Sequence, residues 1–300
     1  MFDFRLKVFH SVAKNLSFTK AGEELFITQP AVTKHIKELE TQLAIRLFER
    51  KGHKIFLTNA GEILLEKVNK INRIYEEIEY EISELRGKIS GRLKLGASST
   101  ISQWVIPEIL YKFNKAYPSI NISLMNGNSK QVEEALLNNE IDLGIVEGNK
   151  RRKELKYNIF KSDILVPVVG GNGRLAKKSE ITIDEFVKIP LILREQGSGT
   201  LDVILKHLYE KFKITLNDLN VLMHLGSTES IKSYLYHSDA MAIISCVAVR
   251  KEIEAGLLKK ITLKGVKFKR NFRFVCPHGT QKMLNAKFIA FAKRNFVMNG

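Results

Sequence analysis

The sequence predicts a small helical domain at the N-terminus, then one long helix, then a two-lobed α/β domain. Three observations predict this architecture. Two short amphipathic helices joined by a tight turn fall within the first sixty residues, a heptad repeat of apolar residues follows, and strands alternate with helices after Gly91. A chain of 300 residues is long enough for two separate hydrophobic cores.

The composition is ordinary for a globular protein, with 44% hydrophobic and 27% charged residues. No apolar run approaches the roughly 20 residues needed to span a bilayer. Asp3, Arg5 and Lys7 interrupt the N-terminus where a secretion signal needs an apolar stretch. We therefore expect a cytoplasmic protein without a membrane partner, in which Cys246 and Cys276 are reduced thiols rather than a disulfide.

The net charge of +16 favours a polyanionic partner, but its distribution complicates that inference. Residues 1–60 hold 10 basic and 6 acidic residues, whereas residues 91–300 hold 33 and 19. The excess in the second half is compatible with a wider contact to a nucleic acid, with an anionic ligand or with plain solubility. Charge alone therefore assigns no function.

The first sixty residues have the pattern of a helix-turn-helix. Residues 2–13 and 20–26 predict two helices, and Ser17 or Thr19 caps the second. Thr28 caps a third helix, in which a proline of the first turn removes no backbone hydrogen bond. Its inward positions are Val32, Ile36 and Leu39, and its outer positions are Gln29, Ala31, Thr33, Lys34 and Lys37. In a helix-turn-helix, the second of the two helices, here the one capped by Thr28, typically carries small and basic residues on its outer side.

Residues 9–61 resemble the DNA-binding segment of the LysR-type transcriptional regulators. The matching residues are Phe9, Val12, Ser17, Phe18, Thr19, Ala21, Leu25, Thr28, Gln29, Pro30, Ala31, Val32, Thr33, Ile36, Leu39, Glu40, Leu47, Phe48, Arg50, Thr58 and Gly61. Gly22 stands where the family usually has a second alanine, and His35 where it often has glutamine. A preference for one DNA sequence is therefore not carried over.

The resemblance implies that residues 1–59 form a winged helix-turn-helix that binds double-stranded DNA. Gln29 is expected to pair with an adenine edge and Thr33 to meet a thymine methyl or a phosphate, while basic residues of the helix and wing bind phosphates. The expected DNA-binding residues are Thr28, Gln29, Pro30, Ala31, Thr33, Lys34, His35, Lys37, Arg50, Lys51 and Lys54. The alternative is that these are solvated residues of an ordinary helical bundle.

Residues 60–87 predict one long helix with an a/d stripe. The stripe consists of Leu64, Val68, Ile71, Tyr75, Ile78, Ile82 and Leu85. A lone helix cannot bury such a seam, so we expect it to pair with a second copy of the chain. The alternative, packing against its own domain, usually shows a wider stripe. By resemblance this is the linker helix of the family, which implies a homodimer on a two-fold DNA site and possible assembly into a homotetramer.

Residues 87–91 are expected to form a hinge, and residues 92–300 an α/β domain. Strands are expected at residues 92–97, 120–125, 142–146, 164–169, 191–193, 219–225, 241–245 and 272–276, and helices at 101–116, 130–138, 201–212, 231–236 and 281–296. This alternation predicts parallel sheet in two lobes, lobe 1 at about 92–162 and 266–300 and lobe 2 at about 163–265. The domain resembles the periplasmic-binding-protein-like effector domain of the same family.

Three turns between a strand and a helix are rich in hydroxyl groups, at residues 98–100, 197–200 and 226–228. Ligands of open α/β sheets bind at the carboxyl ends of strands, and helix N-termini suit small anions. We therefore expect an effector site for a small anionic metabolite, lined by Ser98, Ser99, Thr100, Glu147, Arg194, Ser198, Gly199, Thr200 and Thr228. The alternative is that these hydroxyls are helix caps and nothing more.

Three other classes of protein fit the sequence less well. An enzyme is disfavoured because the seven histidines show no metal-ligand spacing, and Ser198 lacks the Gly-x-Ser-x-Gly elbow. No catalytic residue, metal site or cofactor is therefore expected. A solute-binding transport component would need an export signal. A DNA-organising protein without a ligand would not need the large second half. The sequence leaves the effector, the operator and the choice between activation and repression undetermined.

Overall fold

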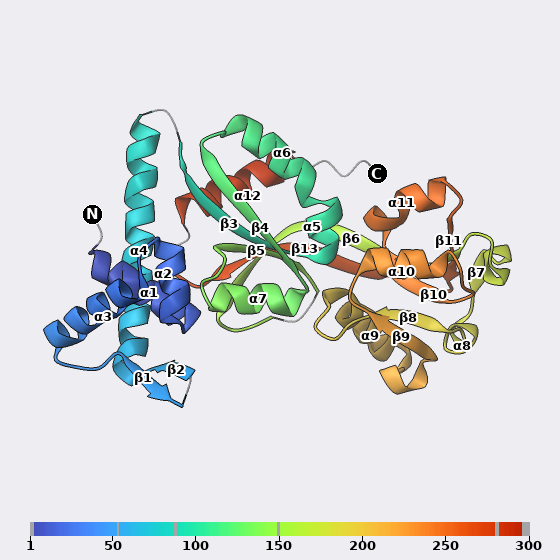
Figure 1. Cartoon of the computed structure of the whole chain (residues 1–300). Helices are drawn as coiled ribbons and strands as arrows, with labels where there is room; N and C mark the ends of the chain where they lie inside the picture. Colours follow the sequence, from blue (N-terminus) through green and yellow to red (C-terminus); the bar gives the residue numbers. More distant parts are fainter. Residues whose placement is uncertain (1–2, 53, 87–88, 149–150, 280–281, 296–300) are drawn as a thin grey trace. The chain divides into compact units, whose positions relative to one another are not determined.

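The computed structural model describes residues 3–52, 54–86, 89–148, 151–279 and 282–295. The chain divides into two compact units, residues 1–88 and 89–300, and each is described by itself (Figure 1). Part of the expected hinge, residues 87–88, and both ends of the expected C-terminal helix, residues 281 and 296, lie outside the described residues.

The first unit is a helical domain with a two-stranded hairpin. Its elements are α1 (Phe4–Asn15), α2 (Phe18–Leu25), α3 (Gln29–Leu43), β1 (Phe48–Lys51), β2 (Lys54–Leu57) and α4 (Asn59–Leu85). The core contains Val8, Phe9, Val12, Val32, Ile36, Leu39, Leu47 and Val68. The inward positions predicted for α3 are thus buried, because their spacing puts them on one face of the helix.

Short-range interactions fix the turn between α2 and α3. Ser17 caps α2 by accepting from the amide of Lys20 at 3.3 Å, and Thr28 caps α3 by accepting from the amide of Ala31 at 3.4 Å. Gly22, which stands where the family usually has an alanine, has a steric reason: a Cβ added there would lie 2.7 Å from the carbonyl oxygen of Ile27. A glycine is therefore required where α2 meets the turn.

The second unit is built on a nine-stranded sheet. Its order is β4-β3-β5-β13-β6-β10-β8-β9, with β11 also pairing with β6. The strands are β3 (Gly91–Ser98), β4 (Ile120–Gly127), β5 (Leu143–Glu147), β6 (Leu155–Gly170), β8 (Leu191–Arg194), β9 (Val221–Leu225), β10 (Met241–Ser245), β11 (Leu258–Lys260) and β13 (Phe268–Pro277). A separate pair is formed by β7 (Glu180–Ile181) and β12 (Thr262–Leu263).

Eight α-helices accompany this sheet within the described residues. They are α5 (Ser99–Trp104), α6 (Ile106–Ala116), α7 (Ser129–Leu137), α8 (Ile183–Phe186), α9 (Gly199–Phe212), α10 (Thr228–Leu235), α11 (Cys246–Glu254) and α12 (Met283–Asn295). We call β3–β5 with α5–α7 and α12 the first lobe, and β8–β10 with α9–α11 the second lobe.

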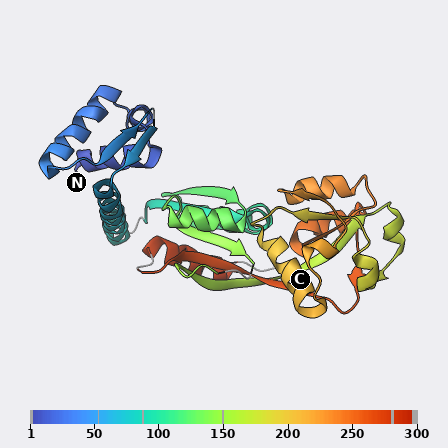
Figure 2. The same ribbon diagram turned by 90° about the horizontal axis from the view of Figure 1, so that it is seen from below.

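In the first lobe, α7 lies on one face of the sheet and α6 and α12 lie on the other (Figure 1, Figure 2). Successive residues of β13 show this alternation. Val275 packs with Val132 of α7, whereas Phe274 is edge-on to Phe288 of α12. Both faces are thus covered, which explains why β5 is buried along its whole length.

The sheet is parallel within each lobe, as predicted, but antiparallel at the junction of the lobes. The long strands β6 and β13 run antiparallel to each other from one lobe into the other (Figure 1), and β13 also pairs antiparallel with β5. The sequence pattern missed their length because the apolar alternation is interrupted where polar residues of β6 and β13 enter the junction, as at Asp163 and Arg270.

The single helix expected over residues 101–116 is two helices, α5 and α6. Val105 lies between them with φ −113° and ψ −54°. Pro107 sits in the first turn of α6, where its missing amide costs no hydrogen bond but prevents α5 from continuing through it.

The lobes approach each other closely where α9 begins. An added Cβ on Gly199 would lie 2.0 Å from the carbonyl oxygen of Glu147, at the end of β5. The neighbouring Gly148 has φ +116°, a conformation that side chains rarely adopt. Only glycine fits both positions, so the junction is sterically specified.

We predict that Gly199→Ala destabilises the second unit by about 1–3 kcal/mol, the usual range for overpacking. The free energy of unfolding is measured by urea denaturation. Gly226→Ala is the matched control, because nothing lies within 4 Å of an added Cβ there. Equal unfolding free energies for the two variants would contradict the close approach.

Candidate functional site

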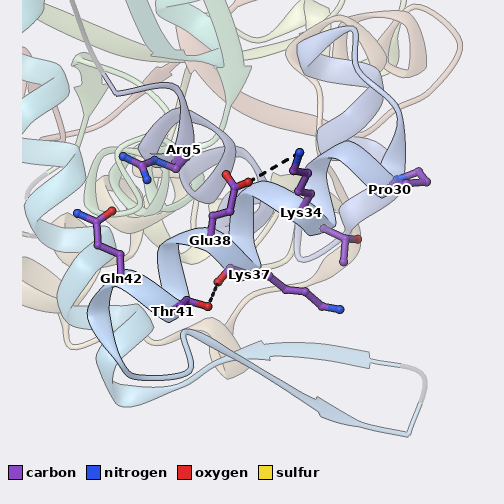
Figure 3. Close-up of a pocket in the computed structure, with 8 residues that line it drawn as sticks. Arg5, Pro30, Lys34, Lys37, Glu38, Thr41 and Gln42 are labelled. Atoms are coloured by element: carbon purple, nitrogen blue, oxygen red, sulfur yellow. Dashed lines mark hydrogen bonds and ion pairs between the residues drawn. The ribbon is translucent and has the colours of Figure 1, made fainter.

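A shallow groove of about 760 Å³ runs along the outer side of α3 (Figure 3). It is lined by Arg5, Pro30, Thr33, Lys34, Lys37, Glu38, Thr41 and Gln42. Four of the residues expected to bind DNA thus lie on one surface. Arg5, Glu38, Thr41 and Gln42 were not predicted, because α1 and the last turns of α3 carry no local signal for this groove.

The two polar residues expected to contact bases are joined to each other. The side-chain amide of Gln29 donates to the Thr33 hydroxyl at 3.0 Å, and that hydroxyl donates to the carbonyl oxygen of Gln29 at 3.1 Å. This pairing holds the Gln29 side chain over the first turn of α3. The Thr28 hydroxyl accepts the capping hydrogen bond from the amide of Ala31, and its own O–H can still donate.

An acidic residue reduces the net positive charge of the groove along α3. Glu38 lies 4.0 Å from Lys34, one helical turn away. His35 does not line the groove; its ring is edge-on to Phe4 at 5.2 Å, and its Nδ1 atom is buried without a hydrogen-bond partner. At the edge of the groove, hydrogen bonds from Arg5 lower the pKa of Asp3. Lys37 is exposed and is the cation of α3 least engaged with an acid.

The hairpin β1–β2 carries the three basic residues expected in a wing. Arg50 lies 6.0 Å from the ring of Phe18, whereas Lys51 forms an ion pair of 2.8 Å with Glu49. Lys51 and Lys54 face each other across the hairpin. All three basic side chains are exposed, so the hairpin presents a cationic tip.

The apolar stripe of α4 splits into two parts. Leu64 and Val68 pack into the core of the first unit, as the alternative interpretation required. Farther along, the apolar side chains are exposed: Ile71 at 36%, Ile74 at 54%, Ile78 at 44%, Ile82 at 46% and Leu85 at 89%. Ile74 was not part of the predicted stripe. The outer half of α4 therefore presents an unpaired apolar surface.

In the second unit, the predicted hydroxyl groups converge on a carboxylate. Glu147, at the end of β5, accepts hydrogen bonds from Ser98, from Thr100 at 3.4 Å and from Thr200 at 3.4 Å. These three residues come from both lobes, and all are buried. The hydroxyls expected to receive an anion therefore already hold one that belongs to the chain.

Two residues missed at the sequence level complete this cluster. Arg270, from β13, lies 3.2 Å from Glu147 and donates to Thr200 at 2.8 Å. Its Nε donates to Asp163 of β6 at 2.6 Å, and Ser245 donates to the same carboxylate at 2.8 Å. The Nη2 atom of Arg270 is buried with no partner. Asp163 and Arg270 lie just before the predicted strands at residues 164–169 and 272–276, so no local pattern marked them.

A second cluster surrounds Arg194, at the end of β8. Its guanidinium is 4% exposed and donates to Ser99 at 3.2 Å, to Thr228 at 3.4 Å and to the carbonyl oxygen of Gly226 at 3.3 Å. Its carboxylate partner is the adjacent Glu195, at 2.8 and 3.0 Å. Since Ser99 belongs to the first lobe, Arg194 joins the two lobes.

The three hydroxyl turns do not play the same part. Ser198 accepts from the amide of Thr200 at 3.2 Å and therefore caps α9, as the cap interpretation expected. Neither Ser98 nor Ser227 makes a side-chain cap to its helix. Ser129, which was not predicted, donates to the carbonyl oxygen of Glu147 at 2.8 Å. The turns at α5 and α10 thus bind side chains rather than their own backbone.

The described part of the chain offers no metal site of three or more His, Cys, Asp or Glu residues. Cys246 and Cys276 are free thiols, and burial raises the pKa of each. Among the described helices, none combines the length and apolar character required to cross a membrane.

Two family models match this chain. The model of the bacterial regulatory helix-turn-helix protein, lysR family, matches residues 4–62, and that of the LysR substrate binding domain matches residues 86–297. Among curated proteins, the HTH-type transcriptional activator CmpR of Synechocystis is 31% identical over 283 residues, covering 94% of this chain and 91% of its own.

Solved structures agree with this match. A full-length variant of OxyR from Pseudomonas aeruginosa shares the fold with a TM-score of 0.74 at 17% identity, covering 98% of this chain and 95% of its own. The Synechocystis CcmR regulatory domain in complex with 2-PG is 27% identical with a TM-score of 0.60, covering 68% of this chain and 96% of its own.

Proposed function

The chain belongs to the LysR family of bacterial transcriptional regulators, and we propose that it binds operator DNA as a dimer and responds to an anionic effector held by Arg194. Its relatives are regulators rather than enzymes, and its second unit is an effector-binding domain. The observation that carries the proposal is the placement of α3, with an exposed polar and basic groove above a buried apolar face.

The groove along α3 supports contact with the major groove of DNA. Gln29, already oriented by Thr33, presents the amide group that pairs with an adenine edge. Lys37, together with Arg50 and Lys54 of the hairpin, supplies cations for phosphates on either side. Arg5 adds a further cation from α1. A protein that acts on operator DNA works in the cytoplasm of a bacterium.

The exposed half of α4 supports self-association. Ile71, Ile74, Ile78, Ile82 and Leu85 form a stripe that one copy of the helix cannot bury. A second α4 offers the same apolar surface, as a two-fold interface requires. Dimers then present two copies of α3 to the half-sites of an inverted repeat, and pairs of dimers give the homotetramer expected from the family resemblance.

The effector site is proposed at the junction of the lobes, around Arg194. The cradle of Ser98, Thr100 and Thr200 is filled by Glu147, so a second anion there would be repelled. Arg194 is different, because its partner Glu195 is the more exposed member of the pair, at 26% against 4%. When a carboxylate or phosphate displaces Glu195, Arg194 keeps its hydrogen bonds to Ser99 and Thr228.

The small-molecule class has further support. The regulatory domain of CcmR, at 27% identity, was solved with 2-PG. In this chain the unpaired Nη2 of Arg270 offers one more donor to an effector acceptor at the same junction. Binding alters transcription only through different affinities of the effector for two arrangements of the dimer.

We predict that Gln29→Ala weakens binding to the operator by about 1–3 kcal/mol while leaving random DNA unaffected, because a base contact is lost. Lys37→Gln is predicted to weaken both DNAs equally and to lower the slope of log K against log salt by about 0.9, because one phosphate contact is lost. Fluorescence anisotropy with DNA from immediately upstream of its own gene measures both effects.

The control for these two variants is Lys67→Gln, which removes an exposed cation from α4. It should change neither operator affinity nor the salt slope. If Gln29→Ala weakened random DNA as much as the operator, Gln29 would not be a base-reading residue.

For the dimer, we predict that Ile78→Glu raises the dissociation constant about tenfold or more, since every 1.4 kcal/mol of unfavourable charge burial is a factor of ten. Sedimentation equilibrium gives the constant. Glu79→Gln, at an exposed neighbouring position, is the matched control. A dimer unchanged by Ile78→Glu would place the interface elsewhere.

For the effector site, Trp104 of α5 provides a signal, because it is the only tryptophan and lies 5.1 Å from Lys232 of the second lobe. We predict that small anionic metabolites, 2-PG among them, change its fluorescence and that Arg194→Met abolishes the change. Operator affinity without ligand should persist in the variant.

Lys206→Met is the control, since it removes an exposed cation of α9 from the same lobe. Ser198→Ala should also preserve the response, because Ser198 caps α9. A full response in Arg194→Met would exclude Arg194 as the anion-binding residue.

A further inference from the structure

Arg273 is a buried cation without a carboxylate partner among the described residues. It comes from β13 and is 6% exposed. Its Nη1 donates to the carbonyl oxygen of Gly148, and its Nε is buried with no hydrogen-bond partner. A carbonyl dipole does not neutralise a guanidinium, so the charge stays uncompensated.

The surroundings add positive charge rather than remove it. Burial lowers the pKa of Arg273, and the proximity of Arg151 lowers it further. Tyr157 is near, but burial raises the pKa of its hydroxyl to about 12, so it is neutral at physiological pH. Glu133, which Tyr157 contacts, has partners other than Arg273: Arg152 lies 3.3 Å from it and Tyr157 donates to it at 2.9 Å.

The other two buried arginines of this unit each have the carboxylate partner that Arg273 lacks among the described residues. Arg270 lies against Asp163 and Glu147, and Arg194 against Glu195. Each has a carboxylate within 3.2 Å. A buried ion is normally paired, because removal from water is unfavourable unless an opposite charge replaces the lost hydration. Arg273 alone among these three has no such group in the described chain.

We propose that Arg273 binds a small oxyanion, of the class of sulfate, phosphate or a carboxylate. The unpaired Nε of the planar guanidinium suits an oxygen of such an anion, and the charge of Arg151 adds to the positive potential around it. This site is separate from the cluster of Arg194 and does not depend on the effector proposal.

The location of the site makes it relevant to the contact between lobes. Arg273 donates a hydrogen bond to the carbonyl oxygen of Gly148. Gly148 itself lies against the start of α9, because a Cβ added to Gly148 would be 3.1 Å from the Cα atom of Gly199. An oxyanion on Arg273 competes with the Gly148 carbonyl for the guanidinium. The anion therefore acts at the end of β5, beside the start of α9.

The test uses the full chain and inorganic sulfate as the probe. Isothermal titration and the thermal unfolding midpoint are measured in sodium sulfate and in sodium chloride at equal ionic strength. The wild type should show saturable binding of sulfate and a higher midpoint in sulfate. Arg273→Met should weaken sulfate about tenfold or more, with a midpoint in chloride no lower than that of the wild type, because an unpaired charge is removed.

Two further variants separate this site from the other possibilities. Arg194→Met should bind sulfate at Arg273 as the wild type does, whether or not the effector proposal holds. Arg151→Gln, an exposed change, should weaken sulfate about threefold or more by removing the second cation. This variant and Arg273→Lys, which lacks the planar fork, decide the question if Arg273→Met does not fold.

The proposal is overturned if the wild type shows no saturable sulfate binding beyond chloride. It is also overturned if sulfate affinity is unchanged in Arg273→Met, or in both Arg151→Gln and Arg273→Lys. A midpoint in chloride that falls in Arg273→Met, with sulfate affinity retained, would assign Arg273 a purely structural role.

Discussion

The carboxylate of Glu147 is the group on which the junction of the two lobes depends. It accepts from Ser98 and Thr100 of the first lobe and from Thr200 of the second, and Arg270 of a crossing strand neutralises it. A carboxylate buried to this degree is stable only when its acceptors and charge are satisfied. The positions of β5, α5, α9 and β13 are therefore coupled through one side chain.

The buried charged residues of the second unit differ in whether the chain itself supplies their partner. Glu147 and Arg270 form an internal ion pair, so the hydroxyls around them serve the fold rather than an external anion. Arg194 lies on the same junction with a more exposed partner, and Arg273 has no acidic partner in the described chain. Buried guanidinium groups thus differ in availability according to which of them the chain itself neutralises.

The first unit follows the same logic with apolar groups. One face of α3 is buried with Phe9 and Leu47. The opposite face is exposed and forms the groove that Lys37 helps to line. Likewise Val68 anchors the start of α4 in the core, and the exposed isoleucines beyond it face away from their own domain. In both helices the buried side determines which residues remain free to bind a partner.

The sequence by itself determined what depends on neighbouring residues. Apolar spacing and the cap at Thr28 located α3, and the glycine-rich turns located the helices at the junction. Only the tertiary structure decided that Arg270 meets Glu147 and that β13 lies between β5 and β6. Periodicity and capping are local properties, whereas these contacts depend on strand order, which joins residues more than a hundred positions apart and leaves no local pattern.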